Sequence, residues 1–113
     1  MTISTAISQT TKPAANTDTV LFGPVPAGLR ASLTVSGVNQ STSSTSKVFI
    51  AVSQNSDPSS PGPDWIEYGR EIASNGGGLE RTCKFLKPGE QIVVRSNDGA
   101  IAFRVDGLQE DNV

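Results

Sequence analysis

Three consecutive glycines, at 76–78, stand close to an arginine and a threonine in the segment Ser-Asn-Gly-Gly-Gly-Leu-Glu-Arg-Thr, residues 74–82. Glycine-rich loops with a nearby cation bind phosphate in nucleotide-binding proteins, where a strand precedes the loop and a helix follows it. Here the residues that follow have the pattern of a strand, and the Gly-Lys-Ser/Thr ending of a phosphate loop is missing. The segment is therefore predicted to be a hairpin-type turn at Asn75-Gly76, with further glycines that permit positive φ angles.

The residue types that most enzymes use as bases and nucleophiles are scarce. The chain has no histidine, which excludes Ser–His–Asp and Cys–His catalysis and removes the main ligand of zinc sites. Its single cysteine, Cys83, cannot form an internal disulfide. Cys83 is either a thiol activated by Arg81 and Lys84 or, as the pattern favours, an inert and partly buried side chain.

Carboxylates are the remaining groups that could do chemistry. Glu67, Glu71 and Glu80 are candidates for the acid pair of a glycoside hydrolase, which must face each other across a cleft. Asp57 and Asp64 could bind calcium, but their loop lacks the acidic spacing of an EF-hand. We expect no catalytic residue, no metal and no cofactor.

Charge and hydropathy exclude further classes of partner. The 9 Lys+Arg residues are scattered and are outnumbered by 11 Asp+Glu, so nucleic-acid binding is not expected. The N-terminus lacks the features of a signal peptide, and no apolar run is long enough to span a membrane. We expect no membrane partner and a protein that is made in the cytoplasm and leaves it only within an assembly.

The pattern that must position these residues is β throughout. Segments with alternating or β-branched character are bounded by Gly, Pro, Asn and Asp turns. The expected strands lie at 18–23, 28–38, 47–52, 64–70, 78–86, 90–96 and 100–108. This spacing predicts an all-β fold, a single antiparallel β-sandwich or jelly-roll-like domain of about seven to eight short strands over 18–113.

Two local predictions bear on how side chains are placed. Asn97-Asp98-Gly99, between two alternating runs, predicts a hairpin. Within 64–70, alternation places Trp65 and Glu67 on one side of the strand and Ile66 and Tyr68 on the other. The aromatic residues, about one per strand, are expected in the core, with Trp65 the exception because it directly follows a proline-rich loop.

Residues 1–17, rich in Ser, Thr and Ala, are expected to form an extended N-terminal arm that lies across a neighbouring subunit. The arm supplies the candidate partner contacts Thr2, Ile3, Ile7 and Pro13. Trp65, Tyr68 and Arg81 complete the candidate contact residues.

Three segments resemble, in order, a family of small β-sandwich virion proteins of tailed bacteriophages, of the type found in marine and cyanobacterial phages. The first is NTDTVLFGPVPAGLRASLTVSGVN, and the second runs from KVFIAVSQ through DWIEYGREIASNGGGLERT. The third is LKPGEQIVVRSNDGAIAFRVDGLQED, so the resemblance covers roughly residues 16–110. The turns GPVPAG and NGGG carry slightly more residues than the shortest members of the family.

The resemblance implies a structural role in the virion and identifies no catalytic residue. On this basis we expect a capsid decoration protein, a homo-oligomer on the particle whose partners are the major capsid protein or other virion proteins. The alternative is a tail, baseplate or fibre-associated module that either adapts other tail proteins or contacts a host glycan. In the glycan-binding version, Trp65 and Tyr68 are the first candidates for the sugar-binding aromatics. An enzyme of carbohydrate metabolism is the third hypothesis and requires two facing carboxylates.

Overall fold

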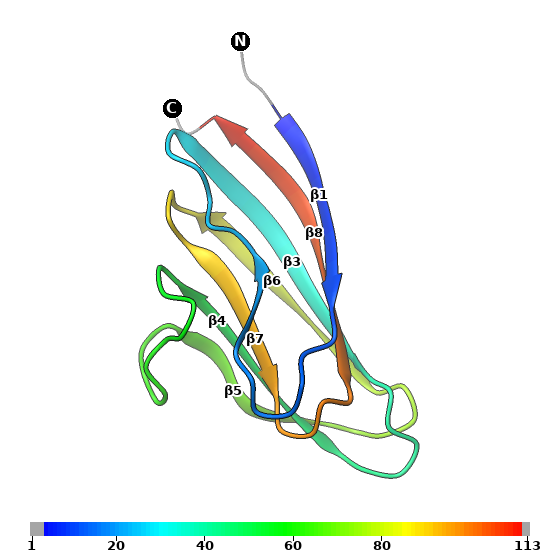
Figure 1. The fold of residues 1–113 in the computed structure, drawn as a ribbon. Helices are drawn as coiled ribbons and strands as arrows, with labels where there is room; N and C mark the ends of the chain where they lie inside the picture. Colours follow the sequence, from blue (N-terminus) through cyan, green and yellow to red (C-terminus); the bar gives the residue numbers. More distant parts are fainter. Residues whose placement is uncertain (1–3, 112–113) are drawn as a thin grey trace.

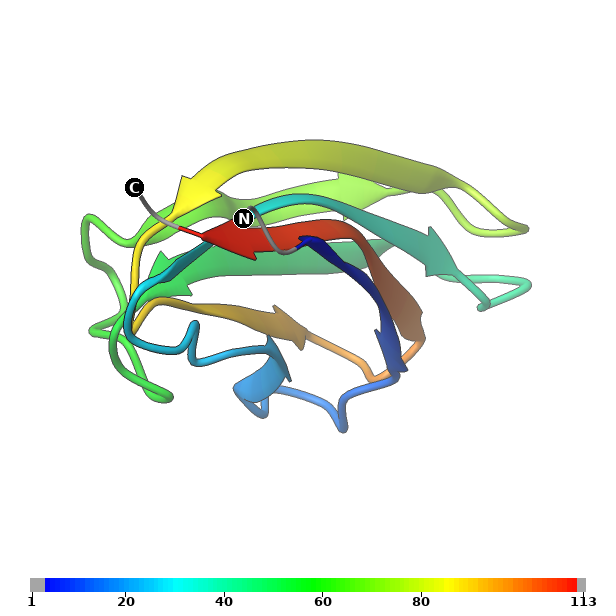
Figure 2. The same ribbon diagram turned by 90° about the horizontal axis from the view of Figure 1, so that it is seen from above.

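Two four-stranded antiparallel sheets pack face to face and enclose one core (Figures 1 and 2). The computed structural model describes residues 4–111. Sheet A has the order β1-β8-β3-β6, and sheet B has the order β2-β7-β4-β5. The predicted all-β antiparallel sandwich is therefore confirmed.

Seven of the eight described strands agree closely with the expected segments of the sequence, and β1 is not among those segments. They are β1 (Ser4–Thr11), β2 (Thr19–Phe22), β3 (Leu29–Asn39), β4 (Ser46–Ser53), β5 (Trp65–Ile72), β6 (Gly78–Leu86), β7 (Gln91–Ser96) and β8 (Ile101–Asp111).

The core lies between the inner faces of the two sheets. On β3, Ala31, Leu33 and Val35 are buried while the residues between them are partly exposed, the alternation expected of a strand with one buried face. Phe103 on β8 and Ile50 on β4 are among the largest fully buried side chains. The outer face of sheet A is consequently free for other contacts.

Most connections cross from one sheet to the other. Among the described strands, only β4 and β5 are consecutive in the chain and paired in one sheet. The hairpin predicted at Asn97-Asp98-Gly99 is wrong, because β7 belongs to sheet B and β8 to sheet A. The turn is fastened to the start of β4 instead: the Ser46 hydroxyl donates to Asp98 Oδ2 at 2.6 Å, and the Lys47 amide donates to Asn97 Oδ1 at 2.8 Å.

The Asn75-Gly76 turn also connects strands of different sheets. Its two residues have φ angles of 60° and 86°, the conformation predicted from the sequence. The turn nevertheless joins β5 of sheet B to β6 of sheet A, so it is not the turn of a hairpin. The Gly76 amide donates to Asn39 O at 3.0 Å and the Asn75 amide to Ser41 O at 2.8 Å, which anchors the crossing to the end of β3.

Residues 4–11, expected to belong to an arm outside the sandwich, form the edge strand β1 of sheet A. Their register with β8 is unbroken, from Ser4 opposite Glu110 to Thr11 opposite Phe103. Polar residues are compatible with a strand at the edge of a sheet, because half of its backbone groups pair with β8 while most of its described side chains face water and, among these, only Ile7 enters the core. The predicted boundary at residue 17 between arm and sandwich is therefore corrected, because residues 4–11 belong to the sandwich.

No helix in the described part of the chain has the length and hydropathy to cross a membrane.

Candidate interaction surfaces

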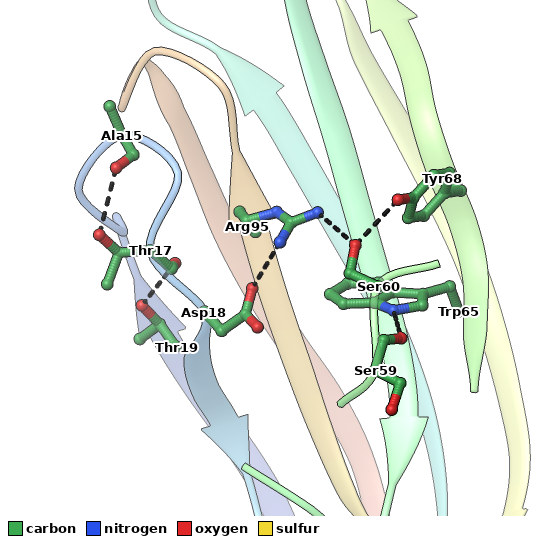
Figure 3. Close-up of polar contacts among 9 residues, drawn as sticks. All are labelled: Ala15, Thr17, Asp18, Thr19, Ser59, Ser60, Trp65, Tyr68 and Arg95. Carbon is green, nitrogen blue, oxygen red and sulfur yellow. Dashed lines mark hydrogen bonds and ion pairs between the residues drawn. The ribbon is translucent and has the colours of Figure 1, made fainter. Parts of the chain in front are cut away.

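Arg95 on β7 is the centre of a polar and aromatic cluster on the outer face of sheet B (Figure 3). Its guanidinium lies over the ring of Phe49, 4.4 Å from the centroid, and over the ring of Trp65, 4.9 Å away. Arg95 Nη1 donates to Asp18 Oδ1, and Nη2 donates to Ser60 Oγ, both at 3.2 Å. The cation is thus shared between two π faces, a carboxylate and a hydroxyl.

Irregularities in β5 explain why the aromatic rings gather. The register between β4 and β5 shifts twice, and Gly69, with a φ angle of 76°, lies at one of the shifts. Trp65 and Tyr68 therefore point to the same side and both pack edge-on against Phe49, with ring centroids 6.2 and 5.2 Å away. The prediction that simple alternation separates Trp65 from Tyr68 is wrong, because each extra residue in β5 reverses the faces that follow it.

The 54–64 loop covers much of this face. Trp65 Nε1 donates to Ser59 O at 2.8 Å (Figure 3). The Ser53 hydroxyl donates to Asp64 Oδ2 at 2.6 Å. Ala51 and Val93 are fully buried although neither belongs to the core between the sheets. The loop is therefore part of the fold, and Trp65 serves to hold it in place.

Tyr68 is the candidate contact residue that remains accessible beside this loop. Half of it (51 %) is exposed, and its hydroxyl is 2.8 Å from Ser60 Oγ. Trp65 is only partly exposed. The glycan-binding alternative therefore has Tyr68 as an exposed aromatic candidate and Trp65 as a partly exposed one.

Asp18 completes the Arg95 cluster and carries a perturbed carboxyl group. Burial raises its pKa above the usual 3.8, and the neighbouring Asp57 carboxyl raises it further, whereas Arg95 acts in the opposite direction. The two calcium candidates have different neighbours. Asp57 lies beside Asp18, whereas Asp64 accepts a hydrogen bond from the Ser53 hydroxyl. No group of three or more acidic or thiol ligands that could hold a metal occurs among the described residues.

The raised pKa of Asp18 predicts a specific pH dependence of stability. The contribution of Asp18 to folding is fully present below its unfolded-state pKa and is lost as the pH rises through its higher folded-state pKa. Asn is neutral in both states, so Asp18→Asn should gain stability relative to the wild type as the pH rises from about 3 to about 7. Urea unfolding over this range measures the difference.

Asp106→Asn is the matched control for this series, because the shift at Asp106 has the opposite sign. The hydrogen bond from Arg104 holds the pKa of Asp106 below 3.8, so its contribution is present above its unfolded-state pKa and is lost as the pH falls. Asp106→Asn should therefore lose stability relative to the wild type as the pH rises. Parallel curves for the two variants would contradict the assigned surroundings of Asp18.

Arg81 lies where the edges of the two sheets meet and pairs with Glu67 of β5. Arg81 Nη1 is 3.1 Å from Glu67 Oε1, and Arg70 Nη1 is 3.5 Å from Oε2. The Glu67 side chain is only 10 % exposed, and its Oε2 accepts no hydrogen bond. Arg81 thus connects the sheets and presents only part of its side chain to solvent. Glu71 and Glu80, the other two candidates for an acid pair, are exposed.

The other candidate contact residues are mostly buried or undescribed. Ile7 belongs to the core, with 8 % exposure, and Pro13 is also buried, so neither is the exposed contact residue of a free arm. The reason is that β1 is integrated into sheet A and that the residues after it fold against the sandwich. Thr2 and Ile3 lie outside the described residues.

Cys83 points into the core from β6. Burial raises the pKa of its thiol to about 11, and nearby Arg81 lowers it only in part. At neutral pH the group is the protonated thiol, which is a poor nucleophile. The inert alternative predicted for Cys83 agrees with this environment.

A hollow of about 500 Å³ lies on sheet A where the ends of β1 and β8 meet β3. Its lining includes the hydroxyls of Thr10 and Ser36, the apolar Val38 and the cations Lys12 and Arg104. Sequence reasoning missed this site, because its residues come from three segments and form no motif. The lining contains no carboxylate, so the hollow lacks the facing acid pair that the carbohydrate-enzyme hypothesis requires.

The outer face of sheet A also carries large exposed apolar side chains, of which Phe85 and Leu108 are the most exposed and Val38 is the third. Leu108 on β8 is 50 % exposed, and Phe85 at the bulge of β6 is 61 % exposed. Phe85 thus departs from the expectation that the aromatic residues lie in the core. Its φ angle of 60° marks the bulge. The guanidinium carbon of Arg30 lies over its ring, 5.8 Å from the centroid. The rest of this face carries hydroxyl groups, such as those of Thr34 and Ser36, and two ion pairs, Arg30 with Glu110 and Arg104 with Asp106. Neither a family model nor a curated protein matches this chain, so its fold and these surfaces are the basis for a functional proposal.

Proposed function

We propose that this chain is a non-enzymatic structural protein of a bacteriophage virion that decorates the capsid and bridges neighbouring capsomers. Its partners are the major capsid protein or other virion proteins. The sandwich fold supports the proposal, as does the ordered resemblance of the chain over residues 16–110 to phage virion proteins. The chain acts through contact surfaces, and no catalytic residue takes part.

The outer face of sheet A is the observation that carries this proposal. Leu108 and Phe85 provide exposed apolar side chains, and Thr34 and Ser36 provide neutral hydroxyl groups. The face also carries charged residues, which are paired with each other: Arg30 with Glu110 and Arg104 with Asp106. Neutral hydroxyls and paired charges cost less to desolvate than unpaired charges, and apolar side chains gain free energy on burial. Such a face suits a protein that lies flat on another protein, and repeated copies on a symmetric shell add avidity.

A loading assay on particles tests this face. Leu108→Glu places a charge in the centre of the proposed contact and should lower occupancy on decoration-free particles by about tenfold or more. Thr42→Glu, in the exposed 41–45 loop, is the matched control and should load like the wild type. Equal loading of Leu108→Glu and the wild type would show that this face is not the contact.

The position on the particle is a separate question that immunogold labelling of intact virions answers. Label over the whole capsid is the expected result, and label absent from virions would contradict the structural role. Label confined to the tail would favour the adaptor function, for which the hollow lined by Lys12 and Arg104 is the specific supporting feature.

Deletion of residues 1–17 is not a suitable test of anchoring. The deletion removes β1 and takes Ile7 out of the core, so the protein should lose stability whether or not the segment contacts a partner. Point variants on exposed positions separate binding from folding.

A further inference from the structure

Each sheet of the sandwich ends in two edge strands, and three of the four edges carry features that prevent pairing with another chain. Edge strands expose unpaired backbone groups, which proteins protect with bulges, charges, proline or short length. β2 has only four residues, contains a register shift and is followed closely by Pro24. This edge offers little backbone to a partner.

The edges on the other side of the sandwich are protected by bulges and charge. β5 has two register shifts and the charged residues Glu67, Arg70 and Glu71. β6 has a bulge at Phe85, whose φ angle is 60°, and it carries Arg81. Both strands depart from the regular backbone that an added strand would need.

β1 differs from the other three edges in every respect. It runs for eight residues, its register with β8 has no shift, and it contains no charge, proline or glycine. Half of the backbone N–H and C=O groups of such a strand point away from β8, because these groups alternate in direction along an antiparallel strand. Among the described strands, β1 is therefore the edge that is built to accept another strand.

We propose that two copies of this chain pair through β1, antiparallel and about a two-fold axis at Ile7, so that sheet A becomes a continuous eight-stranded sheet. A second copy is the occupant because the strand is complementary to itself. It is uncharged, so the two copies bring no like charges together at the seam, although each chain has a net charge of −2. A two-fold axis lets the same groups of both copies satisfy each other.

The axis is placed at Ile7 because this residue is near the middle of β1, so that most of the strand is paired, and because it points inward. Ile7 packs into the core, and neighbouring strands keep a continuous inner face only if inward residues lie opposite inward residues. An axis at Ile7 places the two Ile7 side chains opposite each other and extends the apolar interior across the seam. Thr5 of one copy then lies opposite Gln9 of the other.

The pairing deepens the virion role proposed above, because it doubles the outer face of sheet A that each unit presents to a capsid. The purified chain in solution is sufficient to test it. A failure of self-pairing would leave the particle-loading experiment unaffected, so the two proposals can fail separately.

Charge substitutions at Thr5 and Gln9 test both the pairing and its register by sedimentation equilibrium. Both residues are exposed, so their replacement should leave the fold intact. The wild type should have twice the monomer mass at about 100 µM, a concentration at which weak interfaces are occupied. Thr5→Lys with Gln9→Lys opposes two lysine pairs across the seam and should weaken the dimer by about tenfold or more.

The complementary double variant, Thr5→Lys with Gln9→Glu, opposes lysine with glutamate twice and should restore the dimer. Thr42→Lys with Thr45→Lys adds the same charge as the repulsive variant at a distant exposed loop and should remain dimeric. A monomeric wild type, an unaffected lysine variant or a complementary variant that stays monomeric would each overturn the proposal. Amide hydrogen exchange of the wild type adds a test that needs no variant: alternate amides of β1 should gain protection as protein concentration rises.

Discussion

Replacement of Gly107 by alanine is expected to destabilise the protein by about 3 kcal/mol or more and to lower its melting temperature by on the order of 10 °C. Gly107 lies on β8 between Ile7 of β1 and Leu33 of β3. A Cβ atom at this position would collide with the carbonyl oxygen of Ser32 and would lie 2.9 Å from Leu33 Cα. Both are backbone atoms, so the clash can be relieved only if β3 and β8 move apart in the centre of sheet A.

Gly89→Ala is the control for Gly107→Ala. Gly89 has a φ angle of 86°, and a Cβ atom there would meet no atom within 4 Å. Its replacement should cost only about 1 kcal/mol, the strain of a left-handed conformation for alanine. Chemical denaturation of both variants measures the difference, and equal costs would mean that the close approach of β3 to Gly107 does not constrain the sheet.

Asn39→Ala is expected to cost about 3 kcal/mol, because it leaves buried backbone groups without partners. Asn39 is fully buried, and its Nδ2 donates to Ser44 O at 2.9 Å and to Ile72 O at 3.0 Å. Its Oδ1 accepts the Ser41 amide at 2.9 Å. One side chain thus joins the end of β3, the 41–45 loop and the end of β5, where the chain crosses between the sheets.

The control for burial is Asn97→Ala. Asn97 Oδ1 also accepts a backbone amide, from Lys47 at 2.8 Å, but Asn97 is exposed and water can replace the lost bond. Its replacement should cost no more than about 1 kcal/mol. Denaturation curves that place Asn39→Ala within the range of Asn97→Ala would contradict the role of Asn39 as the buried anchor of the crossing.

The strands could be predicted because side-chain periodicity is a local property. The alternation in Leu29–Asn39 and in Ile101–Asp111 marks the buried face directly, and the structure confirms both strands. β1 was missed because its burial depends on pairing with β8, almost a hundred residues later, and its polar composition carries no periodic apolar signal. The turn residues at 97–99 wrongly predict a hairpin, because they specify a reversal of the chain but not the sheet to which the next strand belongs.

Most of the contacts in the Arg95 cluster could not be predicted from the sequence. A charged residue within the buried run of β7 is a signal that a partner must exist. Its partners, however, are Asp18 and Ser60, which lie 77 and 35 residues away. The rings of Trp65 and Tyr68 meet only because bulges in β5 reverse the expected faces, and such bulges leave little trace in the pattern of residues.

The pairing of β1 with β8 also determines how the protein responds to mechanical load. Ser4 lies opposite Glu110, so both described ends of the chain are at the same end of sheet A (Figure 1). A force that pulls these ends apart acts across the ladder and breaks its hydrogen bonds one pair at a time, as a zipper opens. A force along the strands would instead load many bonds together. In the virion role proposed above, attachment through the sheet faces and edges would load many bonds together, whereas tethers at Ser4 and Glu110 would be the weakest points of attachment.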